Sequence, residues 1–264
     1  MNRRLEFLGE MGLAPLWRLR ARDAPPAEEQ NQAAPEFEAG TVSVAAPATA
    51  VPPPVVTLEA APAAAAGADQ RSLRIARLTL DELKAEVKAC TACGLCKSRT
   101  QTVFGVGDES ADWLIVGEAP GAEEDARGEP FVGQAGKLLD NMLAAIGLAR
   151  GENVYIANVL KCRPPGNRNP EAGEVARCSP LLARQIQLVQ PKLIIAMGRF
   201  AAQTLLNSDA SIASMRGKLY RYQGVPTIVT YHPAYLLRSL PEKAKAWEDL
   251  CFARATVAGG TIKK

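Results

Sequence analysis

The sequence predicts an α/β fold with a mainly parallel sheet and helices on both of its faces. Short apolar runs typical of buried strands alternate with longer segments of helical periodicity. One such run, 113–116, stops abruptly at a Gly/Pro-rich turn, 117–121. Because open α/β sheets bind ligands at the carboxyl ends of their strands, this turn is the first candidate for a functional site.

The individual elements follow from periodicity and from turn residues. A capping-box pattern at Thr79 and Glu82 begins the first helix, which we expect to end at Cys90. Further helices are predicted from apolar periodicity at 137–148, 172–189, 199–206 and around Asp249. Buried strands are predicted at 113–116, 154–157 and 193–197, and a hairpin over 215–230 leads into the strand 227–231.

The composition is that of one globular domain with additional low-complexity sequence. The 264 residues are 47% hydrophobic and 22% charged, which suffices for a well-buried core. No apolar run reaches the roughly 18 residues that span a bilayer, and no signal-peptide core follows the first residues. We therefore expect a soluble cytoplasmic protein. We also expect it to be a monomer, the simplest assembly.

Residues 23–70 are predicted to be a disordered linker that precedes the folded domain, residues 71–264. The linker contains seven acidic residues and no Lys or Arg, and it includes low-complexity Pro and Ala blocks at 52–54 and 63–66. Such a segment cannot bury enough apolar surface to offset its chain entropy. Residues 1–22 are instead apolar and basic, so they are either a docking peptide or a terminal helix that folds back on the domain.

The predicted folded domain carries an excess of positive charge. The whole chain has a formal net charge of +3, but residues 71–264 contain 26 basic and 19 acidic residues. A basic domain suits a polyanionic partner such as nucleic acid. Many enzymes with other substrates carry a similar charge, so charge alone leaves both interpretations open.

Three of the predicted strands run into a polar residue: Glu118, Asn158 and His232. Because the carboxyl ends of parallel strands share one edge of a sheet, we expect these residues to form one site. Each also has a structural interpretation, since Glu118 can cap a turn, Asn158 can end a strand and His232 can be a structural hydrogen-bonding group. His232 is the only histidine of the chain and directly precedes Pro233.

The cysteines predict a metal site. Cys90 and Cys93 have the spacing of a two-ligand hook, and Cys162 and Cys178 lie farther along the chain. Four thiolates from two places can bind zinc or an iron–sulfur cluster. Cys96 extends the first group to C-x-x-C-x-x-C, but the fourth cysteine and the proline of a ferredoxin motif are missing. The alternative is that all six cysteines are buried thiols.

Five motifs, in order along the chain, resemble those of the family 4 uracil-DNA glycosylases. They are Gly117–Gly121 with the following Glu-Glu-Asp, Pro130–Gly133, Asn158–Pro165, Arg216–Tyr220 and His232–Arg238. The resemblance spans roughly residues 78–253. It implies a three-layer α/β/α sandwich around a mainly parallel four-stranded sheet.

The resemblance also implies a cofactor. Family 4 enzymes carry a [4Fe–4S] cluster, and their ligand pattern falls on Cys90, Cys93, Cys162 and Cys178. Cys96 occupies a position that the family does not require, so it is either a bystander or a backup ligand. The cluster is expected to be structural and to tie the first helix to the loop after Asn158.

The activity that the resemblance implies is that of a monofunctional uracil-DNA glycosylase in base excision repair. Such an enzyme flips uracil out of DNA and hydrolyses its N-glycosidic bond, which leaves an abasic site. Phe131 is expected to stack on the flipped base, although it can also be an ordinary core residue. Asn158 is expected to pair with N3–H and O4 of uracil, a pattern that cytosine reverses. Glu124 is the candidate for excluding thymine.

Catalytic roles follow from the charges that develop when the bond breaks. Uracil O2 becomes negative, and His232 is expected to donate a hydrogen bond to it, assisted by backbone N–H groups around Gly117 and Ala119. The sugar becomes positive, and Glu118 is expected to position water or to offset that charge.

DNA contacts are expected in two segments. Three basic side chains near the cysteines are expected to face phosphates: Lys161, Arg163 and Arg168. Three residues after His232 are expected to insert into the duplex where the base leaves: Leu236, Leu237 and Arg238.

Residues 1–22 resemble the amino-terminal motif of the psi subunit of the DNA polymerase III holoenzyme. The resemblance rests on Arg3-Arg4, an L-G-x-M-G-L pattern and Trp17-x-Leu19-Arg20, and it implies docking on the chi subunit. A second function stays open, that of a non-catalytic iron–sulfur or zinc protein that binds nucleic acid as a replication accessory factor. The intact Glu118, Asn158 and His232 favour the enzyme.

Overall fold

The computed structural model describes residues 70–259, which contain one mixed sheet. The predicted docking peptide and residues 23–69 of the predicted linker lie outside the described residues. The described part of the sheet has the strand order β1-β3-β2-β4-β6-β5. Its strands are β1 (Val106–Gly107), β2 (Trp113–Gly117), β3 (Val154–Asn158), β4 (Leu193–Met197), β5 (Leu219–Tyr222) and β6 (Val225–Thr230).

The expected four-stranded parallel sheet forms the centre of this larger sheet. Strands β3, β2, β4 and β6 pair in parallel, while β1 and β5 add antiparallel edges. The hairpin predicted over 215–230 is confirmed as the β5–β6 pair. Sequence analysis missed β1, because its two residues are too few to show a periodicity.

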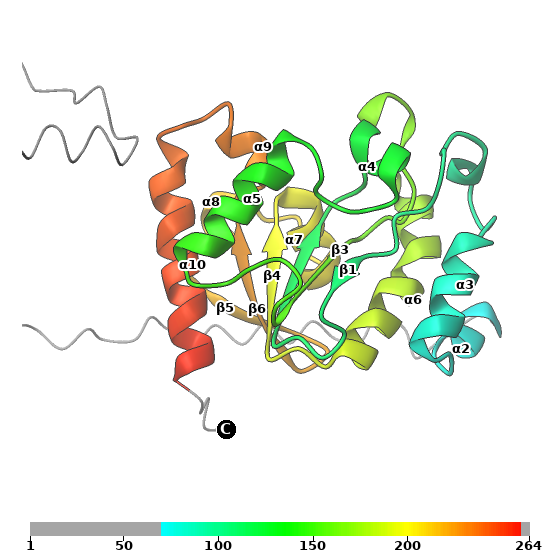
Figure 1. The fold of residues 1–264 in the computed structure, drawn as a ribbon, viewed down its shortest axis with the longest axis horizontal. Helices are drawn as coiled ribbons and strands as arrows, with labels where there is room; N and C mark the ends of the chain where they lie inside the picture. Colours follow the sequence, from blue (N-terminus) through cyan, green and yellow to red (C-terminus); the bar gives the residue numbers. More distant parts are fainter. Residues whose placement is uncertain (1–69, 260–264) are drawn as a thin grey trace, which may run out of the picture. The chain divides into compact units, whose positions relative to one another are not determined.

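The helices cover both faces of the sheet, as the alternating pattern predicts (Figure 1). Those that pack on the sheet or beside it are α4 (Ala122–Arg127), α5 (Gln134–Ala145), α6 (Ala172–Val189), α7 (Arg199–Leu206), α8 (Ile212–Met215), α9 (Pro233–Leu236) and α10 (Glu242–Ala258). The structure also contains α2 (Gln70–Ile75), α3 (Leu80–Lys88) and two short 3₁₀ helices, η1 (Gly94–Lys97) and η2 (Pro165–Asn167). The predicted bounds of α6 and α7 are confirmed.

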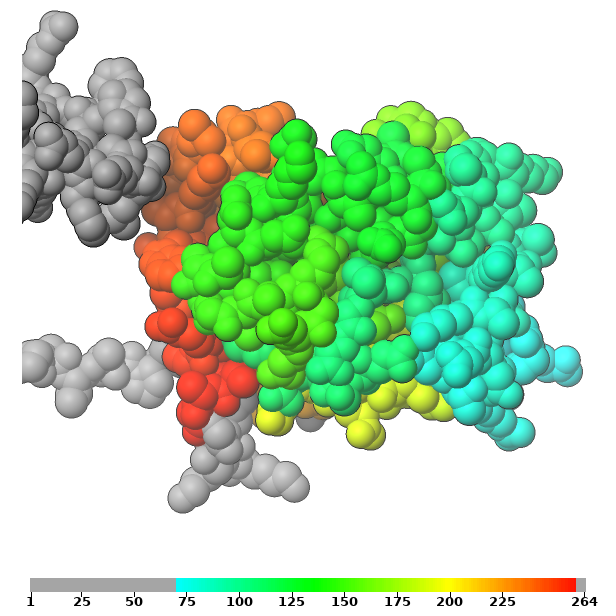
Figure 2. Space-filling view, in the orientation of Figure 1, coloured from blue at the N-terminus to red at the C-terminus, as the bar shows by residue number. Residues whose placement is uncertain are grey.

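Two hydrophobic clusters lie on opposite faces of the sheet. Alternate strand residues such as Leu114 and Ile194 pack with α6, α7 and α8, while Ile115 and Ile195 pack with α5, α9 and α10. This alternation is expected of strands buried on both faces. In the space-filling view, the green part of the chain, which includes α5, closes over one face (Figure 2). The fold is therefore the expected three-layer α/β/α sandwich.

A third, smaller cluster joins α2 and α3 to α6 and to the loop after β3. It contains Ile75, Leu83 and Val87 from the two helices, with Cys162 and Cys178 among its other members. The capping box that begins α3 is confirmed, since the Glu82 carboxylate accepts the Thr79 N–H at 2.7 Å. Within residues 70–259, no helix is long and apolar enough to cross a membrane.

Candidate active site

The ends of β2 and β3 lie directly beside each other at the carboxyl edge of the sheet. Gly117 is the register partner of Asn158, so the turn after β2 and the loop after β3 start at the same level. His232, which follows β6, is farther from the ends of β2 and β3 than the sequence predicts, because β4 lies between β2 and β6. Gly198, at the end of β4, leaves that space clear: a side chain there would approach His232 Cβ to 3.0 Å.

Three of the expected site residues meet beside a fourth, Gly117. The Phe131 ring stacks against the His232 imidazole, with 5.4 Å between ring centroids and 27° between planes. A side chain at Gly117 would overlap with the Phe131 ring and with Asn158 Oδ1. Close approach of these groups therefore requires glycine at the end of β2. The structure thus brings Gly117, Phe131, Asn158 and His232 together.

Asn158 presents an unused acceptor at this point. The residue is 2% exposed, and its Oδ1 has no hydrogen-bond partner among the described residues. Nearly all buried polar atoms in folded proteins are hydrogen-bonded, because leaving one unpaired costs free energy. This buried amide oxygen at the ligand-binding edge of the sheet is therefore available to accept an N–H group from a ligand.

His232 is held as a neutral donor. Its Nδ1 accepts the backbone N–H of Ala234 at 3.1 Å, which makes His232 the N-cap of α9. Burial lowers the pKa of His232 to about 4, although the nearby Glu124 opposes this shift. The imidazole is therefore neutral at pH 7, and its single proton lies on Nε2 because Nδ1 is an acceptor. Nε2–H is free to donate to an oxygen atom that becomes negative.

Glu118 follows β2 and is partly buried. Burial raises the pKa of its carboxyl group, and the charge of Arg199 acts in the opposite direction. Arg199 is exposed and begins α7 directly after Gly198. The next residue of the turn, Ala119, packs partly against the third hydrophobic cluster. The site therefore combines a carboxylate, a neutral imidazole and an amide at one edge of the sheet.

The acidic cluster after Gly121 holds the loops of the site in place. Glu124 Oε1 accepts the backbone N–H groups of Val132 and Gly133 at 3.0 and 3.1 Å, and its Oε2 accepts that of Gly121 at 3.1 Å. Asp125 is 4% exposed and accepts the backbone N–H of Thr100 at 2.9 Å. Both carboxylates are thus engaged with backbone, a structural role that the sequence did not indicate.

The backbone at Phe131 has an unusual conformation. Its φ is 55°, in the left-handed region that residues other than glycine rarely adopt. The guanidinium of Arg150 donates to the carbonyl oxygens of Pro130 and Phe131 at 3.0 and 2.8 Å, and it pairs with Asp140 at 2.9 Å. A side chain at Gly136 would overlap with the Phe131 carbonyl. Such strain persists only where the surroundings fix it, so these contacts determine where the ring lies.

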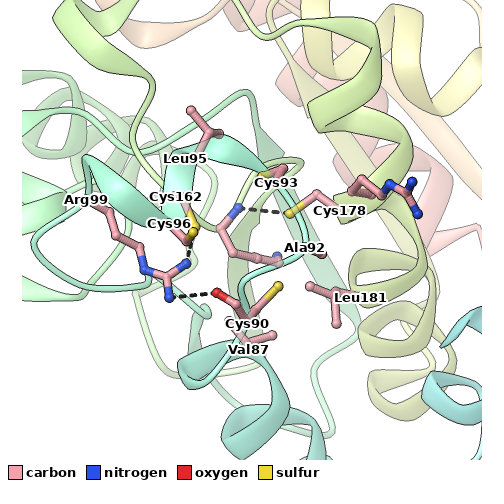
Figure 3. A pocket seen from close by; sticks show the side chains of 12 residues that line it. Val87, Cys90, Ala92, Cys93, Leu95, Cys96, Arg99, Cys162, Cys178 and Leu181 are labelled. Atoms are coloured by element: carbon pink, nitrogen blue, oxygen red, sulfur yellow. Dashed lines mark hydrogen bonds between the residues drawn. The ribbon is translucent and has the colours of Figure 1, made fainter.

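The four predicted metal-ligating cysteines line one pocket, together with Cys96 (Figure 3). They come from four places: the segment just after α3, the residue before η1, the loop after β3, and α6. In Figure 3 the side chains of Cys90, Cys162 and Cys178 point toward the same space. All six cysteines of the chain are free thiols, and Cys251 does not line this pocket.

Hydrogen-bond donors surround these sulfur atoms. The guanidinium of Arg99 donates to Cys162 Sγ at 3.0 Å, and the Lys161 backbone N–H donates to Cys178 Sγ at 3.3 Å (Figure 3). Burial raises the pKa of Cys178 to about 11, so its thiolate requires a cation or metal to form. Among the described residues, no three metal-ligating side chains cluster tightly enough for a single ion. The chemistry of the set, thiols with hydrogen-bond donors to two of their sulfur atoms, is that of ligands which bind zinc or iron.

Two of the expected DNA contacts are wrong. Lys161 is 1% exposed and Leu236 is 1% exposed, so neither side chain reaches solvent. Lys161 lies in the interior because its ammonium group donates to the Asn158 carbonyl at 2.7 Å. Leu236 belongs to the cluster between the sheet, α5 and α10.

The other expected DNA contacts stay predictions. Leu237 is 43% exposed and Arg238 is also exposed, as insertion into DNA requires. Arg168 pairs with Glu174 at 2.6 Å, with its side chain 38% exposed. The partly buried Arg163 donates from Nε to Asn167 at 2.7 Å.

The fold and the site define a class of protein: an α/β/α sandwich with buried polar side chains at the carboxyl edge of its parallel strands. The model of the uracil DNA glycosylase superfamily matches residues 104–251. The chain belongs to this superfamily, which confirms the motif-based assignment. The match does not include residues 1–22, where docking on the chi subunit stays a prediction.

Several relatives of the chain are Type-4 uracil-DNA glycosylases. The chain is 48% identical over 167 residues to the Type-4 uracil-DNA glycosylase of Archaeoglobus fulgidus, which covers 60% of this chain and 83% of the relative. It is 46% identical over 180 residues to the Type-4 uracil-DNA glycosylase of Sulfurisphaera tokodaii, which covers 65% of this chain and 81% of the relative. The Type-4 uracil-DNA glycosylase of Thermotoga maritima is 44% identical over 155 residues, which cover 58% of this chain and 80% of the relative.

Proposed function

We propose that the protein is a monofunctional uracil-DNA glycosylase, which hydrolyses the N-glycosidic bond of deoxyuridine in DNA and leaves an abasic site. Membership of the superfamily and 48% identity to a Type-4 uracil-DNA glycosylase support the proposal. The observation that carries it is the buried, unpaired Oδ1 of Asn158 beside the stacked rings of Phe131 and His232.

Recognition of uracil rests on hydrogen bonding at the Asn158 amide. Oδ1 accepts N3–H of the flipped base, and Nδ2 donates to O4. Cytosine has an acceptor at N3 and a donor at N4, so it would leave buried polar atoms unpaired on both sides. The Phe131 ring supplies an apolar surface for stacking. Thymine is excluded by the wall that Glu124 holds in place through its bonds to Gly121, Val132 and Gly133.

Bond cleavage is assisted by two groups of opposite character. As the bond between C1′ and N1 breaks, uracil leaves with negative charge on O2, to which His232 donates its Nε2–H. The sugar develops positive charge, which the carboxylate of Glu118 offsets while it orients the attacking water. The water oxygen bonds to C1′, and its released proton neutralises the uracil anion in solution.

The direct test of this function is release of free uracil from an oligonucleotide that contains a single deoxyuridine. We expect free base and an alkali-sensitive site in that strand, and neither product from matched oligonucleotides with thymidine or deoxycytidine. An alkali-stable strand after incubation with excess protein overturns the enzyme. Binding of DNA without release would favour the non-catalytic accessory protein.

We infer that Cys90, Cys93, Cys162 and Cys178 hold a [4Fe–4S] cluster. Their shared pocket, the donors to their sulfurs and the Type-4 relatives support this inference. When bound, the cluster supplies a covalent link between the end of α3 and the β3–α6 segment. The cysteines contribute thiolates, and Arg99 donates to one of them.

Replacing Cys178 with serine is expected to remove the cluster, because a buried hydroxyl group is a poor ligand for iron. Purified wild-type protein should be brown and contain about four irons per chain, whereas Cys178→Ser should be colourless. Cys251→Ser is the matched control and should keep its iron, since Cys251 lies outside the pocket. Zinc instead of iron in the wild type would contradict the cluster. Loss of iron in Cys96→Ser would make Cys96 a ligand.

The activity is expected to fall at acidic pH when Glu118 gains a proton. Burial raises the pKa of this carboxyl group above its ordinary value of about 4.3. The active carboxylate is therefore present above that raised pKa and lost as the pH falls through it. In Glu118→Gln, the decrease of kcat/KM at acidic pH should disappear. A decrease near pH 6.5 that survives in Glu118→Gln would instead indicate that His232 titrates, in conflict with its lowered pKa.

We propose that residues 1–22 form a docking peptide for a replication protein, the chi subunit of DNA polymerase III, and that the glycosylase is a cytoplasmic monomer. The sequence motif of these residues supports the first proposal. A pull-down with this peptide that recovers no replication protein would contradict it, and sedimentation of the full chain tests the monomer.

A further inference from the structure

Lys161 is buried more deeply than any other charged side chain that the structure describes. It is 1% exposed, whereas lysine almost always keeps its ammonium group in water. Burying a charge is costly unless partners compensate it. The position of Lys161 in the loop after β3, between Asn158 and Cys162, makes its partners informative.

The contacts of Lys161 connect the base site to the cysteine pocket. Its Nζ donates to the backbone carbonyl of Asn158 at 2.7 Å, and its own N–H donates to Cys178 Sγ at 3.3 Å. Its carbonyl accepts the Val103 N–H at 2.8 Å. Burial lowers the pKa of the ammonium group to about 8, and Cys178 and Cys162 are the groups that oppose this shift. The backbone N–H of Lys161 is thus bound to Cys178 in the cysteine pocket, while its side chain extends to the carbonyl of Asn158.

The backbone of Asn158 is otherwise positioned by hydrogen bonds between neighbouring strand ends. The bond from Lys161 Nζ adds a contact to the Asn158 carbonyl. After Asn158 the chain leaves β3, and the next two N–H groups bond to the carbonyls of Gly117 and Glu118 at 2.9 and 3.0 Å. The peptide that follows Asn158 is therefore held at both ends, its N–H by the Gly117 carbonyl and its carbonyl by the ammonium group of Lys161. The side-chain amide of Asn158 has an unpaired oxygen, so it has no described bond of its own that aims Oδ1.

We propose that Lys161 is a positioning residue for uracil recognition, whose ammonium group holds the backbone of Asn158 so that the Asn158 amide faces the base. This inference rests on the proposed function and deepens it. It replaces the expected phosphate contact, and it links the geometry of the base site to an intact cysteine pocket. A buried hydrogen bond from a charged donor is worth more than a neutral one, so its loss should be measurable.

Lys161→Met tests the proposal, because methionine has a similar length and no donor. The readout is equilibrium binding of the cluster-containing protein to an oligonucleotide with 2′-fluoro-2′-deoxyuridine, which resists cleavage, compared with its thymidine counterpart. We expect Lys161→Met to weaken the preference for uracil about 10- to 100-fold. Lys137→Met, which replaces an exposed lysine of α5, should leave the preference unchanged.

A double-mutant cycle separates positioning from general stabilisation. If Lys161 acts through Asn158, Lys161→Met should add nothing to the loss caused by Asn158→Ala. Equal losses in both backgrounds, with iron content and melting temperature preserved, would overturn the proposal. If Lys161→Met does not retain iron, the smaller, uncharged Lys161→Gln is measured in the same cycle with the same criterion.

The outcomes also distinguish failure of this inference from failure of the proposed function. A wild-type protein that neither releases uracil nor prefers the uracil analogue would overturn the function itself. A wild-type protein that releases uracil, combined with an additive cycle, would overturn only the role of Lys161.

Discussion

Replacing Asn158 with alanine is expected to lower kcat/KM for uracil release on the order of 10³-fold. The variant removes both proposed hydrogen bonds to N3–H and O4, which distinguish uracil from cytosine, while leaving Phe131 and His232 in place. Single-turnover release of uracil from a duplex oligonucleotide measures the effect. Asn141→Ala is the matched control, because Asn141 is exposed on α5, and it should have wild-type activity.

The same variant should cost little stability. In the free protein the Asn158 oxygen is buried without a partner, so removing it also removes an unfavourable desolvation. We expect the melting temperature of Asn158→Ala to equal or exceed that of the wild type. A large drop in melting temperature together with the loss of activity would mean that Asn158 is a structural residue. Full activity would exclude it from the base site.

Replacing His232 with asparagine is expected to lower the rate of the chemical step roughly 10²- to 10³-fold. The imidazole has two separate tasks in the proposed mechanism, since Nδ1 caps α9 and the Nε2–H is proposed to donate to uracil O2. Asparagine can still accept the Ala234 N–H, but it has no donor at the Nε2 position. The rate under saturating enzyme isolates the chemical step from DNA binding.

His232→Ala provides the comparison, because it loses the cap as well as the donor. Its rate should resemble that of His232→Asn, but its stability should be lower by about 1 kcal/mol, the usual cost of a lost N-cap. Near wild-type rates in His232→Asn would contradict the proposed role of Nε2–H. Equal stability of the two variants would contradict the capping role of Nδ1.

Strands and helices could be predicted wherever the local pattern of apolar residues indicates a buried segment. The strands 113–116, 154–157 and 193–197 are continuous apolar runs, and all are buried. That Glu118 and Asn158 follow strands ending at one edge of the sheet could be predicted from the parallel arrangement, whereas the register Gly117–Asn158 comes from the structure. The order of the strands leaves no local trace, so the insertion of β4 between β2 and β6 and the need for Gly198 could not be foreseen.

The parts of the site that sequence reasoning missed depend on contacts between distant residues. Arg150 lies in a turn after α5, and nothing near it in the sequence indicates that it bonds to Phe131. Basic residues are usually exposed, which favours a surface position for Lys161, yet its ammonium group bonds to the buried carbonyl of Asn158. Leu236 and Leu237 are neighbours with opposite environments, since the short helix α9 turns one toward the core.

The cysteine pocket has a consequence for how the helices α2 and α3 are held. Its two halves, Cys90 and Cys93 on one side and Cys162 and Cys178 on the other, are separated by about 70 residues of chain. The proposed cluster would therefore close a long loop of the chain and tie α2 and α3 to the segment that follows β3. Among the described residues, these helices otherwise pack through the small third hydrophobic cluster. We expect protein without iron to become more open to proteases at α2 and α3 than protein with iron.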